Sequence, residues 1–222
     1  SARVTDRQIR PLFPEGMRND VQIIVHTLSD DQTCQPDVLG MIGASAALTI
    51  SDIPFNGPTA AVRMGLKDGE WIINPTFSEA SEGDLDLILA GTKDSINMVE
   101  AGAKIISEEK ILEAIAIGHQ EIIKIIENLE SLKERVSKPK AQLEYYKVSE
   151  EAAAFIQTEV GSSLNEAMAI QDNVDRKTKL TEIRTQLKEK IDSLTEENPL
   201  YKLLKEKPKD IESILFKLEK SM

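Results

Sequence analysis

The pattern of hydrophobic and polar positions changes at about residue 135 and divides the chain into two parts. In the first part the pattern is mixed. A β-branched run at Val21–Leu28 predicts a strand, because such side chains fit a pleated surface. A stretch of small and apolar residues at Pro36–Ile50 predicts a buried helix, and the FNGP sequence at Phe55–Pro58 predicts a break after it.

Two further strand signals lie in the first part. Ala61–Leu66 and Glu70–Ile73 flank Lys67-Asp68-Gly69, in which Asp-Gly is the strongest local signal of a β-hairpin. The segment Asp84–Leu89 begins by alternating acidic residues with leucine, as a half-buried strand does. Helical and strand patterns therefore follow one another up to about residue 135.

A long amphipathic helix is predicted between Ser107 and Val136. Ser107 can cap its N-terminus, and the acidic residues of the first turn interact favourably with the helix dipole. Apolar residues then recur at helical spacing. Pro139 stops the pattern, because proline cannot continue a helix.

Only helices are predicted beyond Ala141, at about 142–160, 163–193, 198–206 and 208–221. The fold class that follows is α+β, with a small all-α domain after it. We place the first domain at 1–136, a linker at 137–141 and the all-helical domain at 142–222.

Composition narrows the class of protein. Aromatic residues make up 4% of the chain, so aliphatic side chains must build the core. The single cysteine, Cys34, excludes an internal disulfide and favours a reducing compartment. No apolar stretch approaches the roughly 18 residues of a membrane span, and a signal-peptide core is absent. We therefore expect a soluble, cytoplasmic protein without a membrane partner.

Charge is distributed unevenly. The net charge of −11 argues against a protein that coats nucleic acid with a basic surface. Arg3, Arg7 and Arg10 are nevertheless spaced i, i+4, i+7, which places them on one helical face before Pro11 ends the helix. This face could bind phosphate or an RNA backbone. It could equally be solvated, or paired with Asp6 and carboxylates further along the chain.

Other candidate residues give weaker signals. His26 and His119 lack partners at metal-ligand spacing and are expected to be structural. Cys34 has no neighbouring base and is expected to be a buried or loop thiol. Asp84 and Asp86 could hold a divalent metal from one face of a strand. The pattern favours the plainer interpretation, in which they form the solvent face of an edge strand.

Several motifs resemble those of the polynucleotide phosphorylase (polyribonucleotide nucleotidyltransferase) family. RVTDRQIRPLFPEG, beginning at Arg3, is similar to a helix motif of the family's first core. The resemblance continues through Met41–Pro58, Leu85–Thr92 and Val99–Gln120. Beyond Ala141 the match is looser and rests on length, helicity and position.

The resemblance implies a fold and an activity. Members of this family carry two RNase PH-like cores of the ribosomal protein S5 domain 2-like class, joined by a helical domain and followed by KH and S1 domains. They form ring-shaped homotrimers that degrade RNA from its 3′ end with phosphate and a divalent metal. The chain is then expected to be the rear part of the first core plus the helical domain, beginning inside a domain and depending on further polypeptide to cover its apolar surface.

The resemblance also implies that this core is inactive. Where the catalytic second core has a serine-rich phosphate loop, Gln35, Pro36 and Asp37 stand here. Proline has no N–H to donate, and aspartate repels phosphate. Ser78 and Ala80 stand where acidic metal ligands are usual. We therefore expect no catalytic residue and no metal ligand in this chain, with Mg²⁺ of the parent enzyme bound by the second core.

The arginines match the family pattern. Arg3, Arg7 and Arg10 coincide with arginines associated with the RNA path, so they are the predicted RNA- or phosphate-binding residues. The expected partners are RNA, the other subunits of a homotrimer and proteins of an RNA-degradation complex. An alternative function is a helical protein-interaction module carried by an inert α/β domain, which the acidic helical segment would favour.

Overall fold

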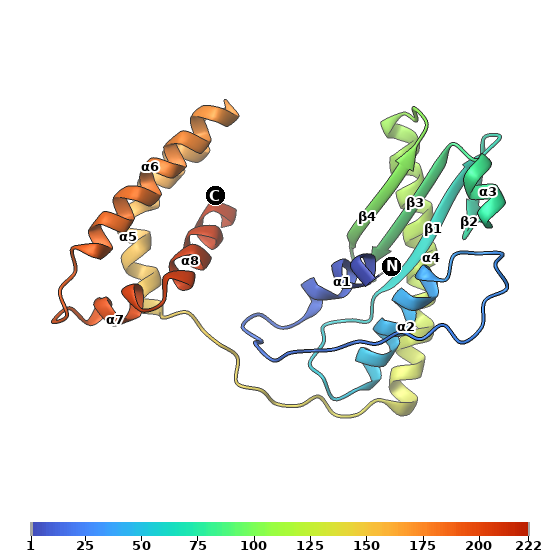
Figure 1. Cartoon of the computed structure of the whole chain (residues 1–222), viewed down its shortest axis with the longest axis horizontal. Coiled ribbons are helices and arrows are strands. Elements are labelled where there is room, and N and C mark those ends of the chain that lie inside the picture. Colours follow the sequence, from blue (N-terminus) through green and yellow to red (C-terminus); the bar gives the residue numbers. More distant parts are fainter. Residues whose placement is uncertain (1, 222) are drawn as a thin grey trace. The chain divides into compact units, whose positions relative to one another are not determined.

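The computed structural model describes residues 2–221 and shows two compact units (Figure 1). The boundary between them along the chain lies between Tyr146 and Lys147. The first unit combines a four-stranded sheet with helices, and the second unit contains helices alone. The predicted α+β fold followed by an all-α part is confirmed. Within the described residues, no helix has the length and apolar character that crossing a membrane requires.

The sheet is antiparallel, with the strand order β2-β1-β3-β4. Its strands are β1 (Ala60–Lys67), β2 (Glu70–Ile73), β3 (Leu85–Gly91) and β4 (Ile96–Ala103). The predicted hairpin is confirmed, because β1 and β2 pair on either side of Asp68-Gly69, where both residues have positive φ. The edge-strand interpretation of the segment after Asp84 is wrong, since β3 lies between β1 and β4.

Helices cover both faces of the sheet (Figure 1). One face packs against α4 (Glu108–Val136), whose N-terminus Ser107 caps as predicted. The helix comes very close to the sheet at Gly118, where a Cβ would lie 2.5 Å from Leu89 Cδ1. The other face packs against α1 (Ala2–Ile9) and α2 (Asp37–Ile50).

Short elements complete the first unit. The α1 helix ends just before Pro11, as predicted, and continues as the 3₁₀ helix η1 (Arg10–Leu12). A helix that the sequence pattern did not predict, α3 (Phe77–Glu82), begins with a capping box formed by Thr76 and Glu79.

The strand predicted at Val21–Leu28 is wrong. The segment runs without regular secondary structure, and no described strand pairs with it. β-Branched residues favour an extended backbone, but a strand also needs a hydrogen-bonding partner. Large apolar side chains remain exposed here, with Leu28 96% accessible. The expectation that further polypeptide covers such surface stays a prediction.

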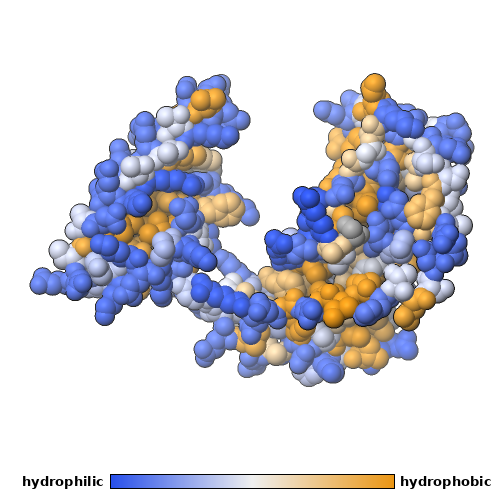
Figure 2. All heavy atoms as spheres, viewed as in Figure 1, coloured by the Kyte–Doolittle hydropathy of each residue, from blue (hydrophilic) through white to orange (hydrophobic). Residues whose placement is uncertain are grey.

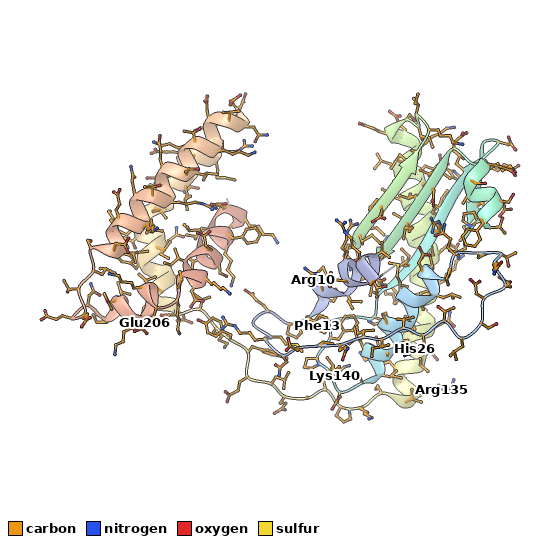
Figure 3. The ribbon with its side chains drawn as sticks, viewed as in Figure 1. Arg10, Phe13, His26, Arg135, Lys140 and Glu206 are labelled. Atoms are coloured by element: carbon orange, nitrogen blue, oxygen red, sulfur yellow. The ribbon has the colours of Figure 1, made fainter. Side chains whose placement is uncertain are left out.

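The predicted linker is bound to the first unit rather than free. Lys138 N–H donates to the carbonyl of Ile50, and the Lys140 ammonium donates to the carbonyls of Leu48, Thr49 and Ser51 at 2.8–3.1 Å. Lys140 thereby closes the C-terminal end of α2, beneath which it lies (Figure 3). Burial in this position lowers the pKa of Lys140 from its usual value.

The same segment is held again at its far end. Tyr146 N–H donates to the carbonyl of Gly16, and the Arg18 guanidinium lies over the Tyr146 ring, 3.4 Å from its centroid. Gly16 has a φ of +80°, and a Cβ at this position would collide with the Tyr146 carbonyl oxygen. Residues 137–146 therefore form a strap across the first unit.

The second unit contains α5 (Glu150–Met168), α6 (Asn173–Asp192), α7 (Pro199–Lys205) and α8 (Pro208–Ser221). The bounds predicted for the first two helices, 142–160 and 163–193, are wrong, because α5 starts later and ends later than predicted and α6 also starts later. Ser149 and Asp172 cap α5 and α6, so these residues mark the true starts. Gly161 is buried inside α5 and does not interrupt it. The helices predicted at 198–206 and 208–221 are confirmed.

Candidate functional site

A cavity of about 810 Å³ opens between α1, the extended segment at residues 21–27 and the N-terminus of α2. Apolar side chains from α1 and the extended segment form much of its walls. Polar side chains line it at the start of α2 and also on α1 and β4. This is the region in which the sequence places the altered phosphate loop. Its chemistry is set by one side chain that the sequence analysis did not select, Arg63.

Arg63 is a buried cation in the middle of β1. It alternates with Val62 and Met64, which face α4, so its own side chain lies on the α2 side of the sheet. Only 7% of the residue is exposed. The guanidinium makes a two-pronged hydrogen bond to Asp86 of β3, from Nε to Oδ1 at 2.6 Å and from Nη2 to Oδ2 at 2.7 Å. Planar pairing of this kind is the strongest contact between arginine and a carboxylate.

The remaining nitrogen of Arg63 reaches the start of α2. Nη1 donates to Gln35 Oε1 at 2.6 Å and to Asp37 Oδ2 at 3.2 Å. Burial alone lowers the pKa of Arg63, but the hydrogen bond to Asp86 and the attraction of Asp86 and Asp37 outweigh it, so the pKa lies above the usual value. The arginine is therefore a permanent positive charge that joins two strands and a helix.

Asp37 carries one of the two negative charges that pair with Arg63. Its Oδ1 accepts a hydrogen bond from the backbone N–H of Val38 at 2.8 Å, in the first turn of α2. The free N–H groups of a helix N-terminus attract anions such as phosphate. Here a carboxylate of the chain itself occupies that place. Pro36 directly before it has no N–H to offer.

The residues present do not fit a divalent metal. Asp86 and Asp37 are the two carboxylates that contact Arg63, and both are already paired with its guanidinium. Ser78 lies on α3, where its hydroxyl is 3.2 Å from Glu82 Oε1. Asp84 is exposed at the start of β3 and does not share the Arg63 cluster. Among the described residues, no group of three or more acidic, histidine or cysteine side chains could hold a metal ion.

The three predicted RNA-binding arginines lie on α1 and η1, outside the Arg63 cluster. Among residues 2–221, the side chains of Arg7 and Arg10 have ion-pair partners, and that of Arg3 has none. Arg7 donates to Glu100 Oε2 at 2.8 Å and to the carbonyl of Val99 at 3.1 Å. Arg10 pairs with Asp6, with Nε 3.0 Å from Oδ1 (Figure 3). Both pairs are exposed, so water and salt weaken them, and each is worth at most about 1 kcal/mol.

The other singled-out residues lie apart. His26 is exposed on the extended segment (Figure 3), and the His119 ring nitrogen Nε2 lies 3.0 Å from the carbonyl oxygen of Thr92. Cys34 is an exposed loop thiol. None of these three residues lines the cavity.

The signal for Arg63 was present in the sequence. It is a lone charge within the apolar run AAVRMGL, where burial is costly unless the charge is paired. Asp86 has the same character within β3. Two opposite charges in two neighbouring apolar strands could have been predicted to pair, but only once the strand register was known.

Comparison with known proteins assigns the first unit to one family. Residues 1–54 match the model of the 3′ exoribonuclease family, domain 1, and residues 57–121 match domain 2 of the same family. The two matches together cover more than half of the chain. The two matches are separated by residues 55–56, shortly before β1 begins at Ala60.

Relatives match along the whole chain. It is 42% identical over 222 residues to a polyribonucleotide nucleotidyltransferase of Heliobacterium modesticaldum and 41% identical to one of Halothermothrix orenii. All of this chain is covered, but it spans only about 30% of the length of these curated relatives. Among solved structures, rice (Oryza sativa) Rrp46 matches with a TM-score of 0.41 and 19% identity, covering 46% of this chain and 48% of that one.

Replacing Arg63 with methionine should lower the free energy of unfolding by about 3 kcal/mol, because two carboxylates lose their shared cation in a partly buried place. Urea denaturation measures the change. Arg10→Met, which removes an exposed pair, serves as the control and should cost less than about 1 kcal/mol.

A second variant separates charge from packing. Arg63→Met combined with Asp86→Leu should recover part of the loss, since no carboxylate is then left without its cation on β3. If Arg63→Met is as stable as the unchanged chain, the cluster does not hold the first unit together.

Proposed function

Because the chain belongs to the 3′ exoribonuclease family, we propose that it forms part of a polyribonucleotide nucleotidyltransferase, an enzyme that degrades RNA from its 3′ end with inorganic phosphate. The observation that carries the proposal is the match along all 222 residues to relatives of that name. Both domains of the family model occur in the expected order in the first unit.

The proposed role of this chain is structural rather than catalytic. A phosphorolytic site needs room for phosphate and for a metal that stabilises the developing charge. In the candidate site, Asp37 stands at the helix N-terminus and Arg63 stands between the carboxylates. The catalytic residues and the divalent metal of the reaction are therefore assigned to polypeptide outside this chain.

The proposed contact with RNA is the outer face of α1 and η1. Arg3 is available for a phosphate group, since its side chain makes no ion pair with another residue in the range 2–221. Arg7 and Arg10 could exchange their exposed carboxylate partners for phosphate at small cost, because exposed ion pairs are weak. RNA binding would thus use Arg3 directly, with Arg7 and Arg10 joining when their partners are displaced.

Assembly and location follow from the same proposal. We propose a homotrimer, with Mg²⁺ required by the complete enzyme, in the cytoplasm and in the turnover of messenger RNA. Association with other RNA-degrading proteins is part of the same proposal. The alternative of a protein-interaction module without a role in RNA turnover is not favoured, because the relatives along the whole chain carry an exoribonuclease name.

The chain alone should release no nucleoside diphosphate from RNA in the presence of phosphate and Mg²⁺. Thin-layer or liquid chromatography of a labelled oligonucleotide substrate measures this. The cause is the internal occupation of the candidate site by Arg63 and Asp37. Sustained release of diphosphates, proportional to the concentration of the chain, contradicts the structural role.

Alanine at Arg3 should weaken binding of single-stranded RNA about threefold at low salt, because one phosphate contact is lost. The slope of log affinity against log salt concentration should fall by about 0.7 for each contact removed. Fluorescence anisotropy with a labelled RNA of 12 nucleotides measures both. Arg7→Ala and Arg10→Ala should act in the same direction.

The matched control is Arg135→Ala, an exposed arginine at the far end of α4 from the candidate site (Figure 3). It changes the net charge equally and should leave the salt slope unchanged. An equal effect of Arg135→Ala and Arg3→Ala would mean that RNA responds only to net charge, and the assignment of α1 would be wrong.

A further inference from the structure

The helical unit contains a groove that the proposed exoribonuclease function does not explain. Its volume is about 520 Å³, and it is lined by α6, the end of α7 and the first half of α8. Both α6 and α8 pack closely against α5, whereas the backbones of α6 and α8 stay apart and ion pairs of Arg184 connect the two helices. Three helices arranged in this way leave the place of a fourth helix open.

The floor of the groove is aliphatic. Buried side chains from three helices form it, and Ile211 adds a partly exposed edge. The buried members are Leu187, Ile191, Leu204 and Leu215. Apolar atoms are visible in this unit, bordered by hydrophilic ones (Figure 2). Such a floor favours an apolar stripe on the molecule that binds there.

The rim is positive on a chain that is negative as a whole. Four cations line the groove against two acids, Asp192 and Glu212. The cations are Arg184, Lys188, Lys205 and Lys209. Arg184 of α6 forms ion pairs with Glu212 and Glu219 of α8. Lys188 and Lys209 make no ion pair within residues 2–221, so the groove is lined by two positive charges that have no carboxylate partner there.

An exposed aromatic side chain stands beside this rim. Phe216 on α8 is 64% exposed. It lies one helical turn beyond Glu212 and two turns beyond Lys209, so it shares their side of the helix. Aromatic residues are enriched among the side chains that anchor protein partners, and an exposed one next to an apolar groove is suited to that role.

We propose that this groove binds an acidic amphipathic helix of a protein partner. The aliphatic floor would receive its apolar stripe, and Lys188 and Lys209 would pair with carboxylates on its two flanks. Between Thr181 and Asp192 the α6 wall is about 16 Å long at 1.5 Å per residue, which matches about three helical turns. Among the described residues, no aromatic side chain lines the groove, so it does not offer the stacking surface that many sites for single-stranded RNA use.

The test uses the full chain and two fluorescent peptides of 14 residues. Both carry leucine at the same helical positions, and the remaining positions are mainly glutamate in one and mainly lysine in the other. The acidic peptide should bind at least tenfold more tightly than the basic one. Reversal of charge in the double variant Lys188→Glu/Lys209→Glu should weaken it at least tenfold, and Phe216→Ala should weaken it severalfold.

The matched control reverses two exposed lysines of the first unit, Lys104→Glu/Lys110→Glu. It alters net charge equally and should change the affinity for the acidic peptide less than twofold. Circular dichroism verifies that every variant is folded.

Three results would overturn the proposal. Equal binding of both peptides would mean that the floor binds apolar stripes regardless of charge. Loss of affinity in the control would mean that net charge decides. Binding of an oligoadenylate of 12 nucleotides that depends on Lys188 and Lys209, without binding of the acidic peptide, would assign the groove to RNA.

Discussion

The buried contact between Arg63 and the carboxylates of Asp86 and Asp37 is the interaction on which the first unit depends. An isolated charge in this place would be costly, and so would either carboxylate alone. Together they are satisfied, and they join β1, β3 and the start of α2. The cluster also places the Asp37 carboxylate at the N-terminus of α2, where a helix would otherwise attract an external anion.

Charge that remains available lies on the outside. The arginines of α1 and η1 are exposed, and their ion pairs with Glu100 and Asp6 are weak enough to be exchanged. The strap at residues 137–146 then crosses the first unit and is held by Lys140 at α2 and by Gly16 near the end of the arginine-bearing segment.

Elements with a local signal could be predicted from the sequence. The hairpin at Asp68-Gly69, the cap at Ser107 and the break at Pro11 depend on the backbone preferences of a few adjacent residues, and the structure has all three. The strand predicted at Val21–Leu28 failed because its partner is not local. Likewise, β4 was missed because its glycine- and acid-containing sequence is defined by pairing with β3.

The candidate site was predictable in part. Sequence comparison located its altered loop at Gln35–Asp37, but the resident cation was missed, since Arg63 meets Asp86 only through the register of β1 and β3. The placement of Arg7 and Arg10 against carboxylates was one of two open alternatives, and spacing alone could not decide between them. Asp86 and Glu100 lie far in the sequence from Arg63 and Arg7, whereas Asp6 is only four residues from its partner Arg10.

The central claim is that Asp37 and Asp86 are held by Arg63 and are therefore not available to a divalent ion. Titration of Mn²⁺ into the isotope-labelled chain, read as paramagnetic broadening of backbone amide signals, tests it most directly. We expect the amides of Val38 and Asp86 to broaden no more than those beside exposed carboxylates elsewhere, because the carboxylates of Asp37 and Asp86 are already hydrogen-bonded to Arg63. Selective and saturable broadening at Val38 and Asp86 would show that a divalent ion displaces the guanidinium, and the account would be wrong.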